Sequence, residues 1–224
     1  MVEQPIKYYL DGTLLSDYGI IVSGSTGLID MPKLKAVFKS NVPDRNGELV
    51  DLSALYYEPR DITLECWIVA DDPTDFNEKM MAFKAAIMLP GLRRLIIEVD
   101  DQDKPLVYDV YLADGISVSK KWAISTMKAT FQIKLREPDP IKKVWMFAVD
   151  DITNTVELDV DCTATVTIRW GDGSETNLYV DGLQTVEHEY PEHPFGDRYI
   201  VFTGNIDDLT IESETAIEVW GKLI

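Results

Sequence analysis

Strict alternation of apolar and polar residues is the feature of this sequence that most constrains its fold. Along residues 126–135, TMKATFQIKL, apolar and polar side chains take turns without interruption. Because successive side chains of a β-strand point to opposite faces, this pattern predicts a strand with one buried face and one wet face. Residues 61–69, DITLECWIV, alternate in the same way but carry Trp67 and Val69 on the second face. We therefore expect this strand to lie centrally in a sheet.

Two further segments have the pattern of β-hairpins. Residues 93–99, RRLIIEV, and 106–112, LVYDVYL, are rich in β-branched and aromatic residues and flank the turn-rich DDQDKP. Residues 8–24, YYLDGTLLSDYGIIVSG, place Asp11-Gly12 where the tip of a hairpin requires a positive φ. The first part of the chain is therefore predicted to be an antiparallel β structure.

One segment of the first part has the period of a helix instead. Within residues 71–91, DDPTDFNEKMMAFKAAIMLPG, apolar residues recur at helical spacing and form one stripe. Asp72 is a suitable N-cap, Pro73 a suitable first residue, and Pro90-Gly91 a suitable end. We expect a helix over residues 73–89 that packs on the sheet, because a stripe with methionines is typical of core packing rather than of a cofactor site.

Charge divides the chain into two parts. The 224 residues have a formal net charge of −18. Residues 1–140 hold 16 Lys and Arg against 22 Asp and Glu, net −6, whereas residues 141–224 hold 5 against 17, net −12. Between them, residues 136–143, REPDPIKK, contain two prolines that favour extended backbone. The sequence thus predicts two domains, 1–140 and 141–224, with a linker at these prolines.

Composition excludes several classes of function. The acidic charge and the lack of a Lys/Arg cluster argue against binding to nucleic acid. No apolar run approaches the roughly 20 residues needed to cross a bilayer, and the first residues lack the pattern of a secretory signal. We therefore expect no membrane insertion and a cytosolic origin. In that setting Cys66 and Cys162, far apart in strand-like segments, are predicted to be free, buried thiols.

Residues 170–174, WGDGS, are the most conspicuous loop of the second part. A phosphate-binding P-loop would need more spacer residues and a Lys beside the Ser. Asp172, Ser174 and Thr176 begin the spacing of a calcium loop, but the required Gly and Glu do not follow. A hairpin corner fits better, with Asp172 bonded to backbone amides of its own turn and Trp170 buried. Weak calcium binding at this turn stays open as an alternative.

No other residues form a convincing catalytic set, so we expect neither an enzyme nor a cofactor or metal. The two histidines, His188 and His193, lack the spacing of a zinc protease, and His188 is typical of a packed strand residue.

A glycosidase pair would need two acids about 5–10 Å apart, but acids at a hairpin turn are by default solvated surface charges. The candidate acids are Glu98, Asp100, Asp101 and Asp109. Tryptophans could stack on a sugar, although alternating apolar runs favour burial. The candidates in the second part are Trp145, Trp170 and Trp220.

The order of the pieces in residues 5–140 resembles the N-terminal domain of phage distal tail proteins. The pieces are YYLDGTLLSDYGIIVSG, VPDRNGELVDLS, YEPRDITLECWI, the helix, LVYDVYL and the last strand ending in KLREPDP. The resemblance implies a β-barrel or sandwich with one helix, of which about six copies close into a ring where the tail tube meets the tip. It also implies that residues 42–51 lie in a long hairpin that links neighbouring subunits, with Arg45, Asn46 and Gly47 as candidate contacts. From the residues alone, the alternative is an ordinary surface loop with Asn46-Gly47 at a turn.

The second part resembles the PKD-type immunoglobulin-like domain over residues 160–204. The resemblance rests on three pieces in order: the turn with Gly171, Asp172 and Gly173, the strand with His188 and Tyr190, and a strand with Tyr199. It implies an immunoglobulin-like β-sandwich. The long link PEHPFGDR, residues 191–198, departs from the pattern, and residues 204–223 replace the usual ending with what is predicted to be an extra pair of short strands.

Together the two resemblances imply a structural component of a phage or prophage tail. The chain would be a hub subunit, most simply a hexamer, that joins the tail tube to the tip or baseplate and presents its β domain to tail proteins or a host-surface glycan. It would be made in the bacterial host cytoplasm and reside at the virion tail tip. The alternative is a carbohydrate-binding or adhesion module, because PKD-like domains often accompany secreted polysaccharide-handling proteins. The lack of a signal peptide argues against that alternative.

Overall fold

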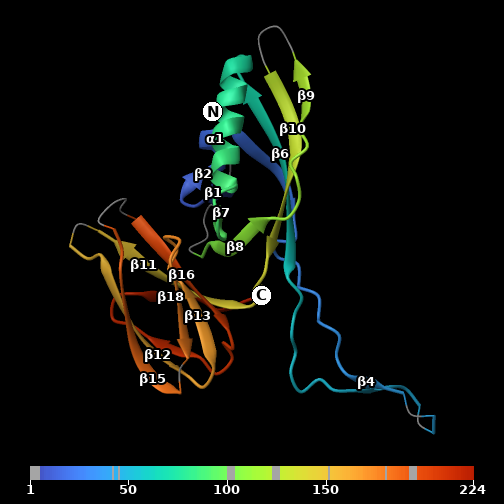
Figure 1. Cartoon of the computed structure of the whole chain (residues 1–224), viewed down its shortest axis with the longest axis vertical. Coiled ribbons are helices and arrows are strands. Elements are labelled where there is room, and N and C mark those ends of the chain that lie inside the picture. The colour runs from blue at the N-terminus through green and yellow to red at the C-terminus, as the bar shows by residue number, and fades with distance from the viewer. Residues whose placement is uncertain are drawn as a thin grey trace.

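The computed structural model describes residues 6–41, 43–44, 46–99, 104–122, 127–150, 152–179, 181–191 and 196–224. Most described residues belong to antiparallel strands, and one α-helix packs against them, so the predicted mainly β fold with one helix is confirmed (Figure 1). The first part contains β1 (Ile6–Leu10), β2 (Thr13–Leu14), β3 (Ile20–Thr26), β4 (Lys39–Ser40), β5 (Leu49–Val50), β6 (Arg60–Ala70), β7 (Arg93–Val99), β8 (Leu106–Leu112), β9 (Ser119–Trp122) and β10 (Met127–Glu137).

The main sheet of the first part runs in the order β2-β1-β7-β8-β10-β6-β3, with β9 beside β10. Its longest ladder joins β10 to β6, from Met127 opposite Ala70 to Glu137 opposite Arg60. The apolar faces of β1, β7 and β8 share one core with those of β6 and β10. Of the two predicted arrangements, the sandwich matches this core, because the described strands do not close into a barrel.

Helix α1 (Pro73–Ile87) begins as predicted and ends two residues before the predicted end. The Asp72 side chain caps it by accepting hydrogen bonds from the amides of Thr74 and Asp75. The predicted apolar stripe is buried against the sheet, where the Phe83 ring lies 6.4 Å from the ring of Phe131 on β10, measured between centroids. Burial of this stripe stabilises a helix that would be marginal in isolation.

Of the two predicted hairpins, one is present as expected and the other in modified form. Strands β7 and β8 pair as expected, and of the turn between them residues 100–103 lie outside the described residues. Asp11 and Gly12 form the tip between β1 and β2, with φ of 49° and 82°. However, a short 3₁₀ helix (Leu15–Tyr18) follows β2, and Gly19 in the left-handed region redirects the chain. Strand β3 consequently pairs with β6 rather than continuing the hairpin.

The second part is a β-sandwich of two sheets. One sheet has the order β14-β13-β16-β11-β18 and the other β15-β12-β17. Apolar side chains of both sheets form one buried core between them. The predicted extra strands after residue 204 exist, but each joins a different sheet. The strands are β11 (Lys142–Val149), β12 (Thr155–Cys162), β13 (Thr165–Arg169), β14 (Glu175–Tyr179), β15 (Gly182–Glu189), β16 (Gly196–Gly204), β17 (Thr210–Glu212) and β18 (Ile217–Leu223).

The two parts are in contact through a third, smaller core cluster. Val107 of β8 packs there with Val144 of β11, Val201 of β16 and Val219 of β18. The Trp220 indole N–H crosses the same junction and donates to the Pro105 carbonyl over 2.8 Å. Whether residues 1–140 and 141–224 fold as independent domains stays a prediction.

Residues 28–59 leave the body as an extended limb, which we call the arm (Figure 1). Its two sides are joined by the short β4–β5 pair and by three backbone hydrogen bonds, among them Lys35 N–H to the Tyr56 carbonyl and Glu58 N–H to the Lys33 carbonyl. In Figure 1 the region of β4 lies far from the main sheet of the first part and from the sandwich of the second part. Apart from its first residue, Leu28, which is buried in the core of the first part, the arm therefore adds surface rather than core.

Two remaining expectations concern the chain as a whole. Cys66 and Cys162 are both free and buried, as predicted. Among the described residues, none of the helical structure is both apolar and long enough to cross a lipid bilayer.

Candidate functional site

The WGDGS turn connects β13 to β14, and its carboxylate serves the turn itself. Asp172 Oδ1 accepts hydrogen bonds from the Ser174 amide at 2.9 Å and from the Ser174 hydroxyl at 2.5 Å, as the hairpin interpretation predicts. Its Oδ2 lies 2.9 Å from His188 Nε2. Burial by itself would raise the pKa of Asp172, but the hydrogen bonds from Ser174 and His188 outweigh it and lower that pKa. The carboxylate is thus held in its charged form by neighbouring donors.

The aromatic residues of the same motif gather around this turn. Trp170 is 1% exposed, which confirms its predicted burial, and its indole N–H donates to the Thr176 hydroxyl over 2.9 Å. The Tyr190 hydroxyl donates to the Trp170 carbonyl over 2.9 Å. Trp170 and Asp172 of the turn therefore form one cluster with His188 and Tyr190, although 16 residues separate Asp172 from His188. Its polar groups bond one another, which is the arrangement of a structural corner.

Both glycines of the turn have the backbone conformation that favours glycine. Gly171 has φ +92° and Gly173 has φ +95°. A Cβ on Gly171 would lie 2.9 Å from the Tyr199 carbonyl oxygen, whereas a Cβ on Gly173 would meet nothing within 4 Å. Two features thus require glycine at position 171: its positive φ and the close approach of β16.

The turn borders a hollow of about 750 Å³ between the two parts of the chain. Arg94 of β7 spans it: its Nε lies 2.5 Å from Asp109 Oδ1, and its Nη1 donates to the Tyr199 carbonyl of the second part. From the other side, Arg169 Nη2 bonds Asp139 at 2.8 Å. Sequence reasoning missed these arginines, because nothing local marks a charge whose partner lies on another strand. They join the two parts by charge-assisted hydrogen bonds.

Glu98 and Asp109, the two described acids among those considered for glycoside hydrolysis, do not form a free pair. Asp109 is buried and committed to Arg94, and Glu98 accepts a hydrogen bond from the Tyr9 hydroxyl at 2.9 Å. The other two, Asp100 and Asp101, lie outside the described residues. A glycosidase needs one carboxyl as acid and another as nucleophile or base, and the geometry of Asp109 serves structure instead.

The tryptophans of the second part do not form an exposed platform for a sugar. Trp145 and Trp170 are buried in the sandwich core. Trp220 is partly buried at the junction, with the Lys104 ammonium 5.4 Å from its ring centre. The platform interpretation is therefore wrong for these three side chains, because the alternating strands turn them inward. The second histidine, His193, lies outside the described residues.

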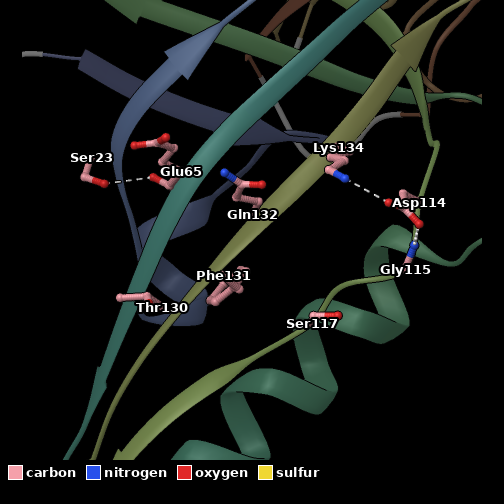
Figure 2. Close-up of a pocket in the computed structure, with 9 residues that line it drawn as sticks. All are labelled: Ser23, Glu65, Asp114, Gly115, Ser117, Thr130, Phe131, Gln132 and Lys134. Carbon is pink, nitrogen blue, oxygen red and sulfur yellow. Dashed lines mark hydrogen bonds and ion pairs between the residues drawn. The ribbon is translucent and has the colours of Figure 1, made fainter.

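A hollow of about 490 Å³ lies over the wet face of β3, β6 and β10. Figure 2 shows its lining, in which Lys134 points to Asp114 and Ser23 points to the backbone of Glu65. The Lys134–Asp114 distance is 2.9 Å, and the Ser23 hydroxyl donates to the Glu65 carbonyl over 3.1 Å. These side chains are exposed and bonded to one another, and the hollow brings together no nucleophile with a base. Among the described residues, no three His, Cys, Asp or Glu side chains are grouped to hold a metal ion.

The arm carries large apolar side chains in water. Phe38 is 73% exposed, Ile29 82% and Tyr56 67%, and Met31, Leu52 and Leu55 are exposed as well. Of the predicted contact residues, Asn46 and Gly47 lie exposed at the end of the arm, with Gly47 at φ 83°, and Arg45 lies outside the described residues. The sequence predicted a loop here, but it did not indicate how many exposed apolar groups would accompany it. Such a surface is typical of a contact with another protein.

Comparison with known proteins found a similarity among solved structures. No protein-family model matches the sequence, and no curated protein matches it. Among solved structures, the chain is similar to the crystal structure of the Dit (gp 19.1) protein of SPP1, described as a paradigm of hub adsorption apparatus in Gram-positive infecting phages. The two share 12% sequence identity with a TM-score of 0.46, over 99% of this chain and 100% of the other.

Proposed function

We propose that this chain is a structural subunit of a phage or prophage tail, a hub subunit that closes into a ring where the tail tube meets the tip or baseplate. The observation that carries the proposal is the arm. It extends from the body with exposed aromatic and aliphatic side chains and has no main core of its own. A neighbouring subunit would cover these side chains.

The physical argument starts from the marginal stability of an isolated two-stranded ribbon in water. The β4–β5 pair comprises two residues on each side, and the arm carries Phe38 and Tyr56 largely exposed. Burying a side chain of this size against a partner contributes about 1.5–3 kcal/mol. Several such side chains on one limb favour association even after the entropy lost on binding is deducted.

The sequence resemblance supports the same function. In the distal tail family, the segment that corresponds to residues 42–51 lies in a hairpin that links neighbours around a ring, and here the described residues of this segment, 43–44 and 46–51, belong to the arm around its β4–β5 pair. Six copies are the favoured number. The second part, for which a PKD-like fold is proposed, would face outward toward other tail proteins or the host. The protein would be made in the bacterial host and reside at the virion tail tip.

The test is the size of the assembly, with arm and body variants compared. Light scattering and negative-stain imaging of the wild-type protein should show rings that increase with concentration. The double substitution Phe38→Ser and Tyr56→Ser should leave a folded monomer. A matched control, Met88→Ser with Leu89→Ser, removes exposed apolar groups beyond the end of α1 and should assemble like the wild type. A wild-type protein that forms no ring, alone or with its neighbouring tail proteins, would overturn the proposal.

A further inference from the structure

Three charged side chains are buried where the arm, the first part and the second part meet. Arg60 begins β6 directly after the arm, Glu137 ends β10, and Lys142 begins β11. Their side chains are only 2%, 1% and 1% exposed. Charges are rarely buried this deeply unless they are paired, so the group has a defined role in the fold.

These side chains form a continuous line of polar contacts from the second part to the arm. The Lys142 ammonium donates to Glu137 Oε1. Glu137 Oε2 lies 3.3 Å from Arg60 Nε, and Arg60 Nη1 donates to the Leu28 carbonyl over 2.5 Å. Leu28 is the first residue of the arm, and Arg60 follows its last. The line thus joins β11 to both sides of the arm's root.

Tyr108 supplies a second connection between the same ends. The Lys142 ammonium lies 4.4 Å from the centre of the Tyr108 ring, a cation–π contact, and the Tyr108 hydroxyl donates to the Leu28 carbonyl over 2.6 Å. Burial raises the pKa of Tyr108, which keeps this hydroxyl protonated as a donor. The Leu28 carbonyl therefore accepts two hydrogen bonds. One donor, Tyr108, contacts Lys142 directly, and the other, Arg60, contacts it through Glu137.

Each charge of the group depends on the others. Burial lowers the pKa of Lys142 and raises that of Glu137, and the contact between the two opposes both shifts. Removing one partner of a buried pair leaves the other uncompensated and forces it to neutralise or to move. Loss of the Lys142 ammonium would therefore disturb the contact of Glu137 with Arg60, and through it the hydrogen bond from Arg60 to the Leu28 carbonyl.

We propose that Lys142 is a positioning residue through which the second part fixes the root of the arm, so that the arm keeps its direction only while β11 is docked on the first part. The arm and the second part, the two surfaces proposed to meet other proteins, would then be coupled mechanically. A load on the second part that shifts β11 would loosen the arm. This inference concerns the single chain and holds whether or not a ring forms.

Hydrogen exchange at the arm's root tests the proposal. The amides of Lys35 and Glu58 are the reporters, since each donates a backbone hydrogen bond across the arm. In Lys142→Met, which keeps most of the apolar stem, their exchange should be about tenfold faster. Amides at the far end of the β6–β10 ladder, around Phe131 and Cys66, should keep their rates. The protein is measured at a concentration where light scattering finds monomer. Unchanged exchange would therefore count against this inference alone and not against the proposed ring.

The neighbouring lysine provides a matched control. Lys143 lies next to Lys142 on β11, and its ammonium donates to the Leu209 carbonyl within the second part. Lys143→Met should leave exchange at Lys35 and Glu58 unchanged. The proposal is overturned if folded Lys142→Met leaves these two amides unchanged, or if Lys143→Met accelerates them equally.

A second variant decides the outcome if Lys142→Met does not fold. Tyr108→Phe keeps the buried ring and removes only the hydroxyl that donates to Leu28. Faster exchange at the same two amides, with the second part unaffected, supports the proposal. Unchanged exchange overturns it, because the root would then not depend on the group around Lys142.

Discussion

The His188 ring lies parallel to the indole of Trp170, with ring centroids 4.4 Å apart and 9° between their planes. His188 belongs to β15 and Trp170 follows β13, so the stack joins the two sheets of the sandwich. Tyr190 meets His188 edge-on at 4.6 Å and bonds the Trp170 carbonyl. The three aromatic positions of the motif thus close one end of the core. Such pairs contribute about 0.5–1.5 kcal/mol each beyond their buried area.

The two glycines of the WGDGS turn should differ in their tolerance of alanine. Gly173→Ala should cost about 1 kcal/mol, because only the positive φ is unfavourable. Gly171→Ala should cost at least about 2 kcal/mol, since its Cβ would also press on the Tyr199 carbonyl. Urea unfolding followed by tryptophan fluorescence measures both. Equal costs would mean that the backbone of β16 can move away freely.

Acid should destabilise the protein partly through Asp172. The pKa of this carboxyl is lower in the folded chain than in the unfolded chain, so the unfolded state takes up the proton first as the pH falls. The stability contributed by Asp172 is present above its unfolded pKa of about 3.9 and is lost as the pH falls through the lower folded value. Asp172→Asn should therefore be less stable at neutral pH and lose less stability in acid.

Comparison with another turn carboxylate isolates this effect. Asp208→Asn removes an exposed acid elsewhere in the second part and should retain the wild-type acid dependence. The measurement is the free energy of unfolding from urea titrations between pH 7 and the acid limit of solubility. If Asp172→Asn and the wild type lose stability in parallel, the carboxylate is not held as described.

Local signals were sufficient to predict the helix and the main strands. The cap at Asp72, the stripe through Phe83 and the alternation along β10 each lie within a few residues of sequence. Helical and strand periods are properties of such short windows, so no knowledge of distant contacts was needed. The same holds for the Asp11-Gly12 tip and the buried Trp170.

Features that depend on distant partners could not be predicted. Residues 136–143 have the composition of a linker, yet Glu137 and Lys142 within them are among the most buried side chains. Their burial follows from Arg60, which reaches Glu137 only because β6 and β10 pair in one register. The pairing of β3 with β6 and the link from Arg94 to Tyr199 have the same origin. Sequence alone contains no local mark of these contacts.

The Cys66 thiol should be inert in the folded protein. Burial raises its pKa to about 12, so almost no thiolate exists at neutral pH. In a Cys162→Ser background, a thiol reagent at pH 8 should not label Cys66 in the native state and should label it fully in denaturant. Rapid labelling of the native protein would show that β6 is accessible from the core side.

Replacement of phenylalanine by alanine should cost much stability at one position and almost none at another. Phe83 belongs to α1 and is fully buried, so Phe83→Ala should cost about 3–5 kcal/mol of unfolding free energy. Phe38 lies exposed on the arm, so Phe38→Ala should change the stability of the monomer by no more than about 0.5 kcal/mol. Urea unfolding at a concentration that keeps the chain monomeric gives both values. A large cost at Phe38 in the monomer would mean that the arm folds back on its own chain, and the surface proposed for a neighbouring subunit would then be occupied already.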